Sequence, residues 1–272
     1  MGRHPDLRHL LLVKPGSQAR LTKFDPGATF GLDKAAAAPL TQRHLERLSD
    51  LQDRFWAESK RSVLVVLQGI DAAGKDGTIQ KVMEAFNPQG CVVSAFKVPT
   101  EEELDHDFLW RIHKRTPRKG EIGIFNRSHY EDVLVVRVHD IVPKRVWSKR
   151  YAQINEFERT LAESGTTIVK FFLAIDRDEQ RERFQARYDD PTRRWKFSMG
   201  DLEERKRWDD YQRAFDEALS KTSTPWAPWY VIPANHKWFR NLAVSSILAD
   251  TIAALRPAYP PEPDLPTDLV IV

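Results

Sequence analysis

The sequence predicts an α/β fold of three layers, in which helices cover both faces of a five-stranded, mainly parallel sheet. Residues 62–68 form a continuous apolar, β-branched run, which is typical of a strand buried on both faces. A glycine-punctuated turn and a helical pattern follow that run directly. Strand and helix patterns then alternate to about residue 255, and such alternation favours parallel strands joined by helices.

The remaining elements follow from the same patterns. Leucines recur at helical spacing between residues 41 and 60, so a helix is expected there. Further strands are expected at 92–98, 121–125, 167–175 and 229–233, and further helices at 76–86, 102–115, 143–163, 178–189, 201–220 and 238–255. Residues 1–40, broken by several prolines, are interpreted as an N-terminal extension, residues 41–256 as one domain and residues 257–272 as a C-terminal tail.

The composition narrows the class of protein. The chain has 272 residues, and its 42 Lys and Arg nearly balance its 39 Asp and Glu, so the whole molecule is not a general polyanion binder. Its single cysteine rules out a disulfide framework within the chain and argues against a cysteine-based zinc site. No apolar run approaches the ~20 residues that a membrane-spanning helix needs, and no secretion signal is evident, so we expect a cytoplasmic protein without a membrane partner.

A phosphate-binding motif follows the first long strand. Residues 69–75, Gly-Ile-Asp-Ala-Ala-Gly-Lys, match G-x-x-x-x-G-K in its required place between a strand and a helix. In such a loop the backbone N–H groups point into one concavity, and the helix N-terminus and the lysine add positive charge. The alternative is a plain glycine-rich turn with an exposed lysine. We predict a P-loop kinase fold in which a polyphosphate group is bound by Gly69, Ala72, Ala73, Gly74, Lys75 and Asp76.

Carboxylates within this loop indicate a metal ion. The residue after the lysine is usually Ser or Thr, whose hydroxyl binds Mg²⁺, but here it is Asp76, and Asp71 lies inside the loop. Two carboxylates would repel a phosphate unless a divalent cation neutralised them, and Mg²⁺ binds carboxylate and phosphate oxygens together. We therefore expect Mg²⁺, with Mn²⁺ as an alternative, at Asp71, whereas Asp76 either binds the metal or caps the helix.

A second polar cluster follows the strand expected at 121–125. It runs Asn-Arg-Ser-His-Tyr-Glu-Asp from Asn126 to Asp132, and open α/β sheets bind ligands beyond the carboxyl ends of their strands. Arg127 is suited to neutralise a transferring phosphoryl group, while Asn126 stands where many P-loop enzymes have a metal-binding acid. His129 is expected to be a hydrogen-bonding loop residue rather than a phosphate carrier. The alternative is a solvated loop that only connects two elements.

The arginine-rich segment from about 176 to 200 is predicted to form a helical lid. Phosphoryl transfer needs arginines that close over the charged chain and exclude water. Arg177, Arg181 and Arg187 are the candidates, with Lys81 as a further one outside the segment. Glutamates are interleaved with these arginines, so an exposed, ion-paired helix face is the alternative for part of the run.

Four motifs together resemble the polyphosphate kinase 2 family. They are the phosphate loop extended to Gly77, residues 125–132 (FNRSHYED), residues 195–198 (WKFS) and residues 227–235 (APWYVIPAN). The similarity runs from about residue 40 to 255, and the combination is far more specific than a phosphate loop alone. The resemblance implies a core similar to thymidylate kinase with a helical lid, and Mg²⁺-dependent transfer of a terminal phosphoryl group between inorganic polyphosphate and a nucleotide.

Within that family, Asn126 and the pair Glu131–Asp132 resemble the subgroup that phosphorylates both nucleoside monophosphates and diphosphates. The resemblance implies AMP and ADP as acceptors and ADP and ATP as products, with guanine nucleotides as further candidates. It places the metal on Asp71 and Asp132, the nucleotide near Asn126, Arg127 and Glu131, and the chemistry at Asp71, Lys75, Arg127 and Asp132. Family members commonly assemble, so a homodimer or homotetramer is expected.

Two other classes of function stay open. An ATP-dependent nucleotide kinase of the thymidylate-kinase type would share the fold but need an adenine pocket for its donor, which the sequence does not exclude. A non-catalytic polyphosphate-binding protein would have no use for the carboxylates at Asp71, Asp76 and Asp132. Nucleic acid is not an expected partner, because no reading helix or RNA-binding motif is recognisable.

Overall fold

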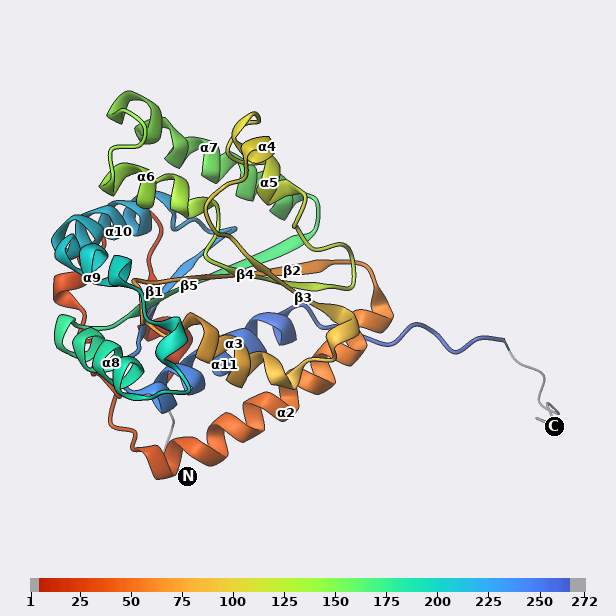
Figure 1. Ribbon diagram of the computed structural model, residues 1–272. Coiled ribbons are helices and arrows are strands. Elements are labelled where there is room, and N and C mark those ends of the chain that lie inside the picture. Colours follow the sequence, from red (N-terminus) through yellow and green to blue (C-terminus); the bar gives the residue numbers. More distant parts are fainter. Residues whose placement is uncertain (1–4, 265–272) are drawn as a thin grey trace.

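The computed structural model describes residues 5–264, and within them the strands form one six-stranded sheet (Figure 1). The strands are β1 (Leu12–Val13), β2 (Ser62–Gln68), β3 (Cys91–Ala95), β4 (Ile122–Asn126), β5 (Thr166–Ala174) and β6 (Trp229–Pro233), in the order β1-β6-β5-β2-β4-β3. All neighbours are parallel except β1, which pairs antiparallel with β6. The mainly parallel sheet is thereby confirmed, and so are the five predicted strands.

The predicted number of five strands is wrong, because the N-terminal segment adds β1. Leu12 and Val13 pair with Tyr230 and Trp229 at the edge of the sheet. Two residues are too few to show the alternation by which a strand is recognised in a sequence. Tertiary contacts hold them instead, since Val13 is buried and its carbonyl oxygen accepts from Ser223 Oγ at 2.6 Å.

Helices cover both faces of the sheet, as predicted (Figure 1). One face carries α2 (Lys34–Glu58), α3 (Lys75–Val82) and α11 (Lys237–Ala254), and the other carries α6 (Val135–Val138), α7 (Lys144–Glu163) and α10 (Trp208–Thr222). Further helices are α1 (Leu7–Leu10), α4 (Glu101–Leu104), α5 (Trp110–His113), α8 (Arg177–Asp189) and α9 (Met199–Lys206), and 3₁₀ turns lie at Leu21–Lys23, Met83–Ala85, Pro88–Gly90, His129–Asp132 and Arg194–Lys196. Within residues 5–264, no helix is long and apolar enough to cross a membrane.

The first long helix begins earlier than predicted. The structure starts α2 at Lys34 rather than Thr41, with Pro39 inside the helix instead of ahead of it. Asp33 sets this start, because its Oδ1 accepts from the Ala36 N–H at 2.7 Å and so caps the helix. The cap and the buried face of α2 therefore outweigh the one hydrogen bond that the proline cannot make.

Two predicted helices are each divided in the structure. Residues 102–115 form α4 and α5, separated by a bend in which Asp107 Oδ1 accepts from the Leu109 N–H at 2.9 Å. Residues 201–220 are divided at Arg207 between α9 and α10. The boundaries predicted for the extension, the domain, the lid and the tail stay predictions, and residues 265–272 of that tail lie outside the described residues.

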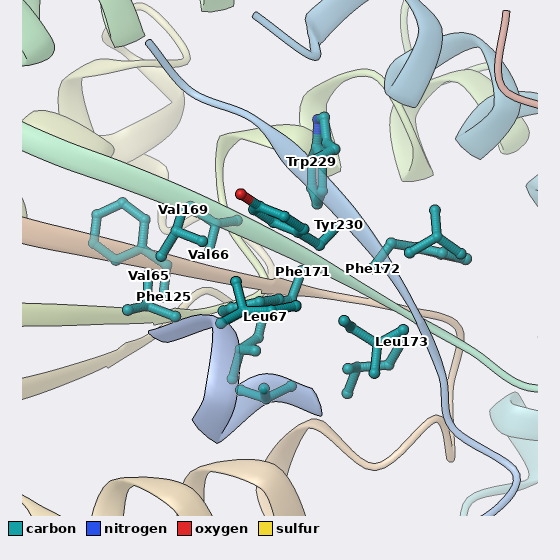
Figure 2. Close-up of a cluster of buried hydrophobic side chains, with 14 of the residues drawn as sticks. Val65, Val66, Leu67, Phe125, Val169, Phe171, Phe172, Leu173, Trp229 and Tyr230 are labelled. Atoms are coloured by element: carbon teal, nitrogen blue, oxygen red, sulfur yellow. The ribbon is translucent and has the colours of Figure 1, made fainter. Parts of the chain in front are cut away.

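The core lies around the central strands. Every residue of β2 is buried, because β5 and β4 pair with it on either side and helices cover both faces. Figure 2 shows apolar side chains of β2, β4, β5 and β6 in one cluster, among them Val66, Phe125, Phe171 and Trp229. At about 1.5–3 kcal/mol for each fully buried apolar side chain, this cluster is a major support of the sheet.

The strand order places the phosphate loop at a topological switch point. From β2 the chain passes to β3 and β4 on one side and then to β5 and β6 on the other. β2 and β4 run in the same direction, in a register that sets Leu67 opposite Asn126. The loops that follow these two strands therefore leave the sheet at the same side, beyond the carboxyl ends of the strands. Open α/β proteins bind ligands there.

Candidate active site

A cavity of about 750 Å³ opens beyond the carboxyl ends of the strands. Its walls come from the phosphate loop, the end of β4, α8 and the start of α11. The predicted site residues that line it are Asp71, Ala72, Gly74, Lys75, Asp76, Asn126, Arg127 and Arg187. The structure thus brings the two motifs and part of the arginine-rich segment to one site.

The phosphate loop has a backbone that requires its glycines. Gly69 and Gly74 have φ of +156° and +104°, a region that residues with a side chain rarely adopt. A Cβ on Gly74 would lie 2.1 Å from Arg240 Nη1, and a Cβ on Gly69 would lie 2.9 Å from the Leu173 carbonyl oxygen. Backbone angle and close packing therefore both demand glycine at these two positions.

Lys75 begins α3 and is buried under the phosphate loop. Its Nζ donates to the Gly69 carbonyl oxygen at 2.6 Å and to that of Ile70 at 3.4 Å. Burial, with a contribution from the charge of Arg127, lowers the pKa of Lys75 to about 8 against the opposing effect of nearby carboxylates. An anion in the cavity would favour the charged amine, so anion binding and the protonation of this lysine are linked.

Polar contacts tie the two motifs together. Arg127 Nη2 lies 2.6 Å from Asp71 Oδ1, and Arg127 Nη1 lies 3.3 Å from Glu131 Oε2. Asn126 Nδ2 donates to Asp76 Oδ1 at 2.8 Å. Both acids of the phosphate loop are therefore bound to the polar cluster after β4, and the solvated-loop alternative for that cluster does not hold.

The structure separates Glu131 and Asp132 from the cavity wall, since neither residue lines it. Asp132 Oδ1 accepts from Arg150 Nη1 at 2.9 Å, and burial raises the pKa of Asp132 to about 6 although Arg150 opposes the shift. Glu131 Oε1 accepts from Gln68 Nε2 at 3.0 Å. Asp71 lines the cavity and Asp132 does not, so the metal ion shared by these two carboxylates stays a prediction.

Only one of the three predicted lid arginines lines the cavity. That residue is Arg187, whose Nη1 lies 3.9 Å from Asp201 Oδ2. Arg177 and Arg181 are exposed and lie outside the lining. Lys81 is also outside it, and its Nζ lies 2.8 Å from Glu84 Oε1. Arg177 and Arg181 thus lie on an exposed face of the segment, and donor binding by these three side chains stays a prediction.

Two arginines outside the predicted set contact the phosphate loop. Arg183 Nη1 donates to the carbonyl oxygens of Ala72 and Ala73 at 2.9 Å each. Arg240 lies against Gly74, is 3% exposed and has no acidic partner within the described residues. Burial and the charge of Arg183 lower the pKa of Arg240 to about 10. A buried guanidinium without a carboxylate is suited to an anionic ligand.

Helix periodicity alone does not single out Arg183. Gln180 and Phe184 are buried and mark the inner face of α8, but Arg177 and Arg181 stand at a spacing of three from them just as Arg183 and Arg187 do. The contacts of Arg183 with the phosphate loop identify it instead. Arg240 lies in the first turn of α11, which starts beyond the carboxyl end of β6 and thus at the ligand-binding edge. Further basic residues of the lining outside the predicted set are Lys97, Arg193, Lys196 and Lys237.

Two carboxylates of the phosphate loop are available to a metal ion at the cavity, those of Asp71 and Asp76. Asp76 does not cap α3, whose N-cap is Gly74 without a side-chain hydrogen bond. Within residues 5–264, no group of three or more His, Cys, Asp or Glu side chains could hold a metal ion. This set fits Mg²⁺, which in kinases binds one or two carboxylates and takes its other ligands from phosphate and water.

A family model and two curated relatives of this chain carry names that refer to polyphosphate as a substrate. A family model described as polyphosphate kinase 2 matches residues 31–259. The chain is 53% identical over 262 residues to the AMP/ADP-polyphosphate phosphotransferase of Meiothermus ruber, covering 96% of this chain and 98% of that protein. It is 48% identical over 251 residues to the ADP-polyphosphate phosphotransferase of Rhodopseudomonas palustris, covering 88% and 86%.

A solved structure agrees with the fold. The crystal structure of polyphosphate kinase 2 from Arthrobacter aurescens matches with a TM-score of 0.92 at 45% identity, over 97% of this chain and 94% of that chain. The region matched by the family model includes the phosphate loop, the cluster after β4 and the arginine-rich segment. The resemblance carried by the four motifs is therefore confirmed, and the chain belongs to the polyphosphate kinase 2 family.

Proposed function

We propose that this chain catalyses the Mg²⁺-dependent transfer of the terminal phosphoryl group of inorganic polyphosphate to AMP and to ADP, which yields ADP and ATP. Its family and the activities named for its relatives in M. ruber and R. palustris support this reaction class. The observation that carries the proposal is the charge of the cavity. Basic side chains from several elements converge beside the phosphate loop, and Arg240 is buried there without an acidic partner within residues 5–264.

In this proposal the donor lies along a basic track. Lys75 and the N–H groups of the phosphate loop bind one phosphate, and Arg127 and Arg240 bind its neighbours. Arg187 approaches from the arginine-rich segment that we propose as the lid. Arg183 is already bonded to carbonyl oxygens of the loop, so it shapes the loop rather than binding the donor. Hydrogen bonds between such cations and phosphate oxygens are roughly twice as strong as neutral ones.

The acceptor nucleotide enters next to the polar cluster after β4, near Asn126, Arg127 and Glu131. A terminal phosphate oxygen of the nucleotide attacks the last phosphorus of the polymer in line, and the bond from that phosphorus to the rest of the polymer breaks. The polymer leaves one phosphate shorter. This attacking oxygen is already anionic, so catalysis consists of positioning and charge stabilisation without a covalent protein intermediate. His129 is fully buried and is not placed to carry a phosphate.

Mg²⁺, or Mn²⁺ in its place, would be held by Asp71 with Asp76 beside it. When bound, it would neutralise oxygens of the donor and acceptor phosphates, which is the usual contribution of a metal to phosphoryl transfer. Arg127, bonded to Asp71, keeps that carboxylate at the cavity. Asp132, which lies outside the cavity lining, stays a predicted further ligand of this ion.

Assembly into a homodimer or homotetramer, a cytoplasmic location and the use of guanine nucleotides stay predictions. Light scattering on purified protein measures the state of assembly directly. Activity assays with a panel of nucleoside monophosphates and diphosphates measure the use of guanine nucleotides.

Nucleotide chromatography tests the proposed reaction. The protein is mixed with long-chain polyphosphate, Mg²⁺ and either AMP or ADP, with no other phosphoryl donor. ADP and ATP from AMP, and ATP from ADP, are the expected products. ATP from ADP alone would contradict the dual-acceptor assignment of Asn126 and Glu131, and no product in either mixture would contradict polyphosphate as the donor.

A further inference from the structure

A fully buried ion pair lies outside the active-site cavity, and the proposed mechanism does not use it. Glu158 on α7 and Lys170 on β5 are both 0% exposed. His129 and Tyr130, in the loop after β4, are equally buried, and none of the four residues lines the cavity. Removing two charges from water is costly, and well-packed apolar side chains often stabilise a core as well, so stability alone does not explain this pair.

The hydrogen bonds of the pair lead to the loop after β4. Lys170 Nζ donates to Glu158 Oε2 at 2.5 Å, to the Tyr130 hydroxyl oxygen at 2.7 Å and to a backbone carbonyl oxygen, that of Thr222, at 2.7 Å. Glu158 Oε1 accepts from the Tyr130 hydroxyl at 2.9 Å and lies 3.1 Å from His129 Nε2. Burial opposes the ionisation of Glu158, but the charge of Lys170 and the bond with His129 keep the pKa of Glu158 below its usual value. A carboxylate outside the cavity thus holds two consecutive residues of the loop.

This loop carries a strained residue that faces the cavity. Arg127 has φ of +62°, a left-handed conformation that a residue with a long side chain keeps only where its surroundings enforce it. Gln68, the last residue of β2, donates to Ser128 Oγ at 3.1 Å and to Glu131 Oε1 at 3.0 Å, which holds the loop from the side of the phosphate loop. The buried pair holds the same loop at two other residues, because Glu158 contacts His129 and Tyr130.

We propose that Glu158 is a positioning residue for phosphoryl transfer: through His129 and Tyr130 it fixes the loop that presents Arg127 to the substrates. Lys170 keeps the carboxylate ionised and fixes the Tyr130 hydroxyl. The inference rests on the proposed function for the identity of the substrates, whereas the mechanical claim rests on the contacts alone. Misplacing a catalytic group by about 1 Å can cost on the order of a hundredfold in rate, so loss of this support is expected to lower turnover.

Two double variants separate the hydrogen bonds from the charges. Glu158→Gln/Lys170→Met removes the ion pair but keeps an oxygen acceptor for His129 and Tyr130. Glu158→Leu/Lys170→Met removes the ion pair and the acceptor. Neither variant leaves an unpaired buried charge, so the difference between them reports the acceptor, and the glutamine variant is the conservative rescue.

Both variants are compared by steady-state kinetics with polyphosphate and ADP and by hydrogen–deuterium exchange, well below their melting temperatures. We expect kcat/KM to be about tenfold or more lower in the leucine variant than in the glutamine variant. We also expect faster exchange in the leucine variant over residues 126–134 and equal exchange over α11. Equal kinetics and equal loop exchange would overturn the proposal. Faster exchange throughout the molecule would assign the pair to stability alone and would overturn it as well.

The exchange measurement does not depend on the substrates. If the unaltered protein transferred no phosphate from polyphosphate, the proposed function would fail, and loop exchange would still decide the role of Glu158. Should the leucine variant not fold, Tyr130→Phe replaces it, because this change removes one hydroxyl and leaves the ion pair. Faster exchange over residues 126–134 is then expected, and exchange equal to that of the unaltered protein would contradict the proposal.

Discussion

The two faces of α8 carry arginines in opposite surroundings. On the inner face, the Arg183 side chain is 9% exposed and donates to the carbonyl oxygens of Ala72 and Ala73. On the outer face, the Arg181 side chain is 66% exposed, and its Nη2 lies 3.6 Å from Asp178 Oδ1. An exposed ion pair of this kind contributes about 0–1 kcal/mol to stability. Arg181 therefore lies on a solvated surface, whereas Arg183 is packed against the phosphate loop.

This difference shows that the density of arginine along a segment does not measure the charge presented to a ligand. What matters is which guanidinium groups have lost water and have no carboxylate to neutralise them. By this criterion Arg240, which lies outside the arginine-rich segment, presents more unshielded charge to the cavity than Arg177 or Arg181 does. Variants of the inner and outer residues test whether the distinction extends to catalysis.

The largest effect is expected at Lys75, the most enclosed cation of the phosphate loop. Lys75→Ala removes that charge, so turnover with polyphosphate and ADP should fall by about 10²–10³-fold while the circular dichroism spectrum persists. Arg181→Ala is the matched control on the outer face and should stay within about twofold of the unaltered rate. Normal turnover in Lys75→Ala would remove the phosphate loop from the active site.

The next largest effect is expected at Asp71, and it should distinguish this residue from Asp132. Asp71→Asn removes a carboxylate of the cavity wall, so activity should fall by about a hundredfold and should not recover with more nucleotide. Asp132→Asn alters an acid paired with Arg150, and we expect it to lower the melting temperature with little change in the Mg²⁺ concentration for half-maximal rate. A Mg²⁺ titration of both variants checks this. An equal loss of Mg²⁺ affinity in the two would restore Asp132 as a metal ligand.

A smaller effect is expected at Arg240. A hydrogen bond to a charged group contributes about 1.5–3 kcal/mol, so Arg240→Ala should raise the KM for polyphosphate about tenfold or more. Arg240→Lys should recover part of that loss, and Arg177→Ala, at an exposed position outside the cavity lining, should leave this KM within about twofold. If the alanine variants at 240 and 177 gave the same KM, burial without an acidic partner would not identify donor-binding arginines.

The smallest expected effect is a dependence of polyphosphate binding on pH. The pKa of Lys75 is lowered to about 8, so this lysine is charged below that pH and loses its proton above it. Binding of a polyanion should therefore weaken from about pH 8 upward, by at most about tenfold per pH unit for one proton. Calorimetry between about pH 7 and 9.5 measures the dissociation constant. Lys75→Arg, which stays charged over this range, should flatten the profile, and an unchanged profile would exclude Lys75 as its cause.

The main strands were predictable because their signals are local. The run at Ser62–Gln68 is apolar and β-branched without interruption, and its bounds were predicted to the residue. β1 was not predictable in this way, because two residues become a strand only through pairing with β6. The bend at Asp107, which divides a predicted helix, likewise depends on one side-chain hydrogen bond that competes with the helix.

The site was predictable where a motif fixes the spacing of its residues. Asp71, Lys75 and Arg127 line one cavity because each follows directly after a parallel strand or its turn. The orientation of a side chain was not predictable, because it depends on contacts with residues that are distant in sequence. Asp132 is paired with Arg150, eighteen residues away, and Arg240 reaches the phosphate loop from the last helix.

The central claim is that polyphosphate rather than ATP is the phosphoryl donor, and an isotope measurement tests it most directly. The protein receives ³²P-labelled polyphosphate, unlabelled ATP, AMP and Mg²⁺ in one mixture, and the nucleotides are separated early in the reaction. The account predicts label in newly formed ADP and then in ATP. Unlabelled ADP formed from ATP and AMP, with all label retained in polyphosphate, would contradict it and favour an ATP-dependent nucleotide kinase.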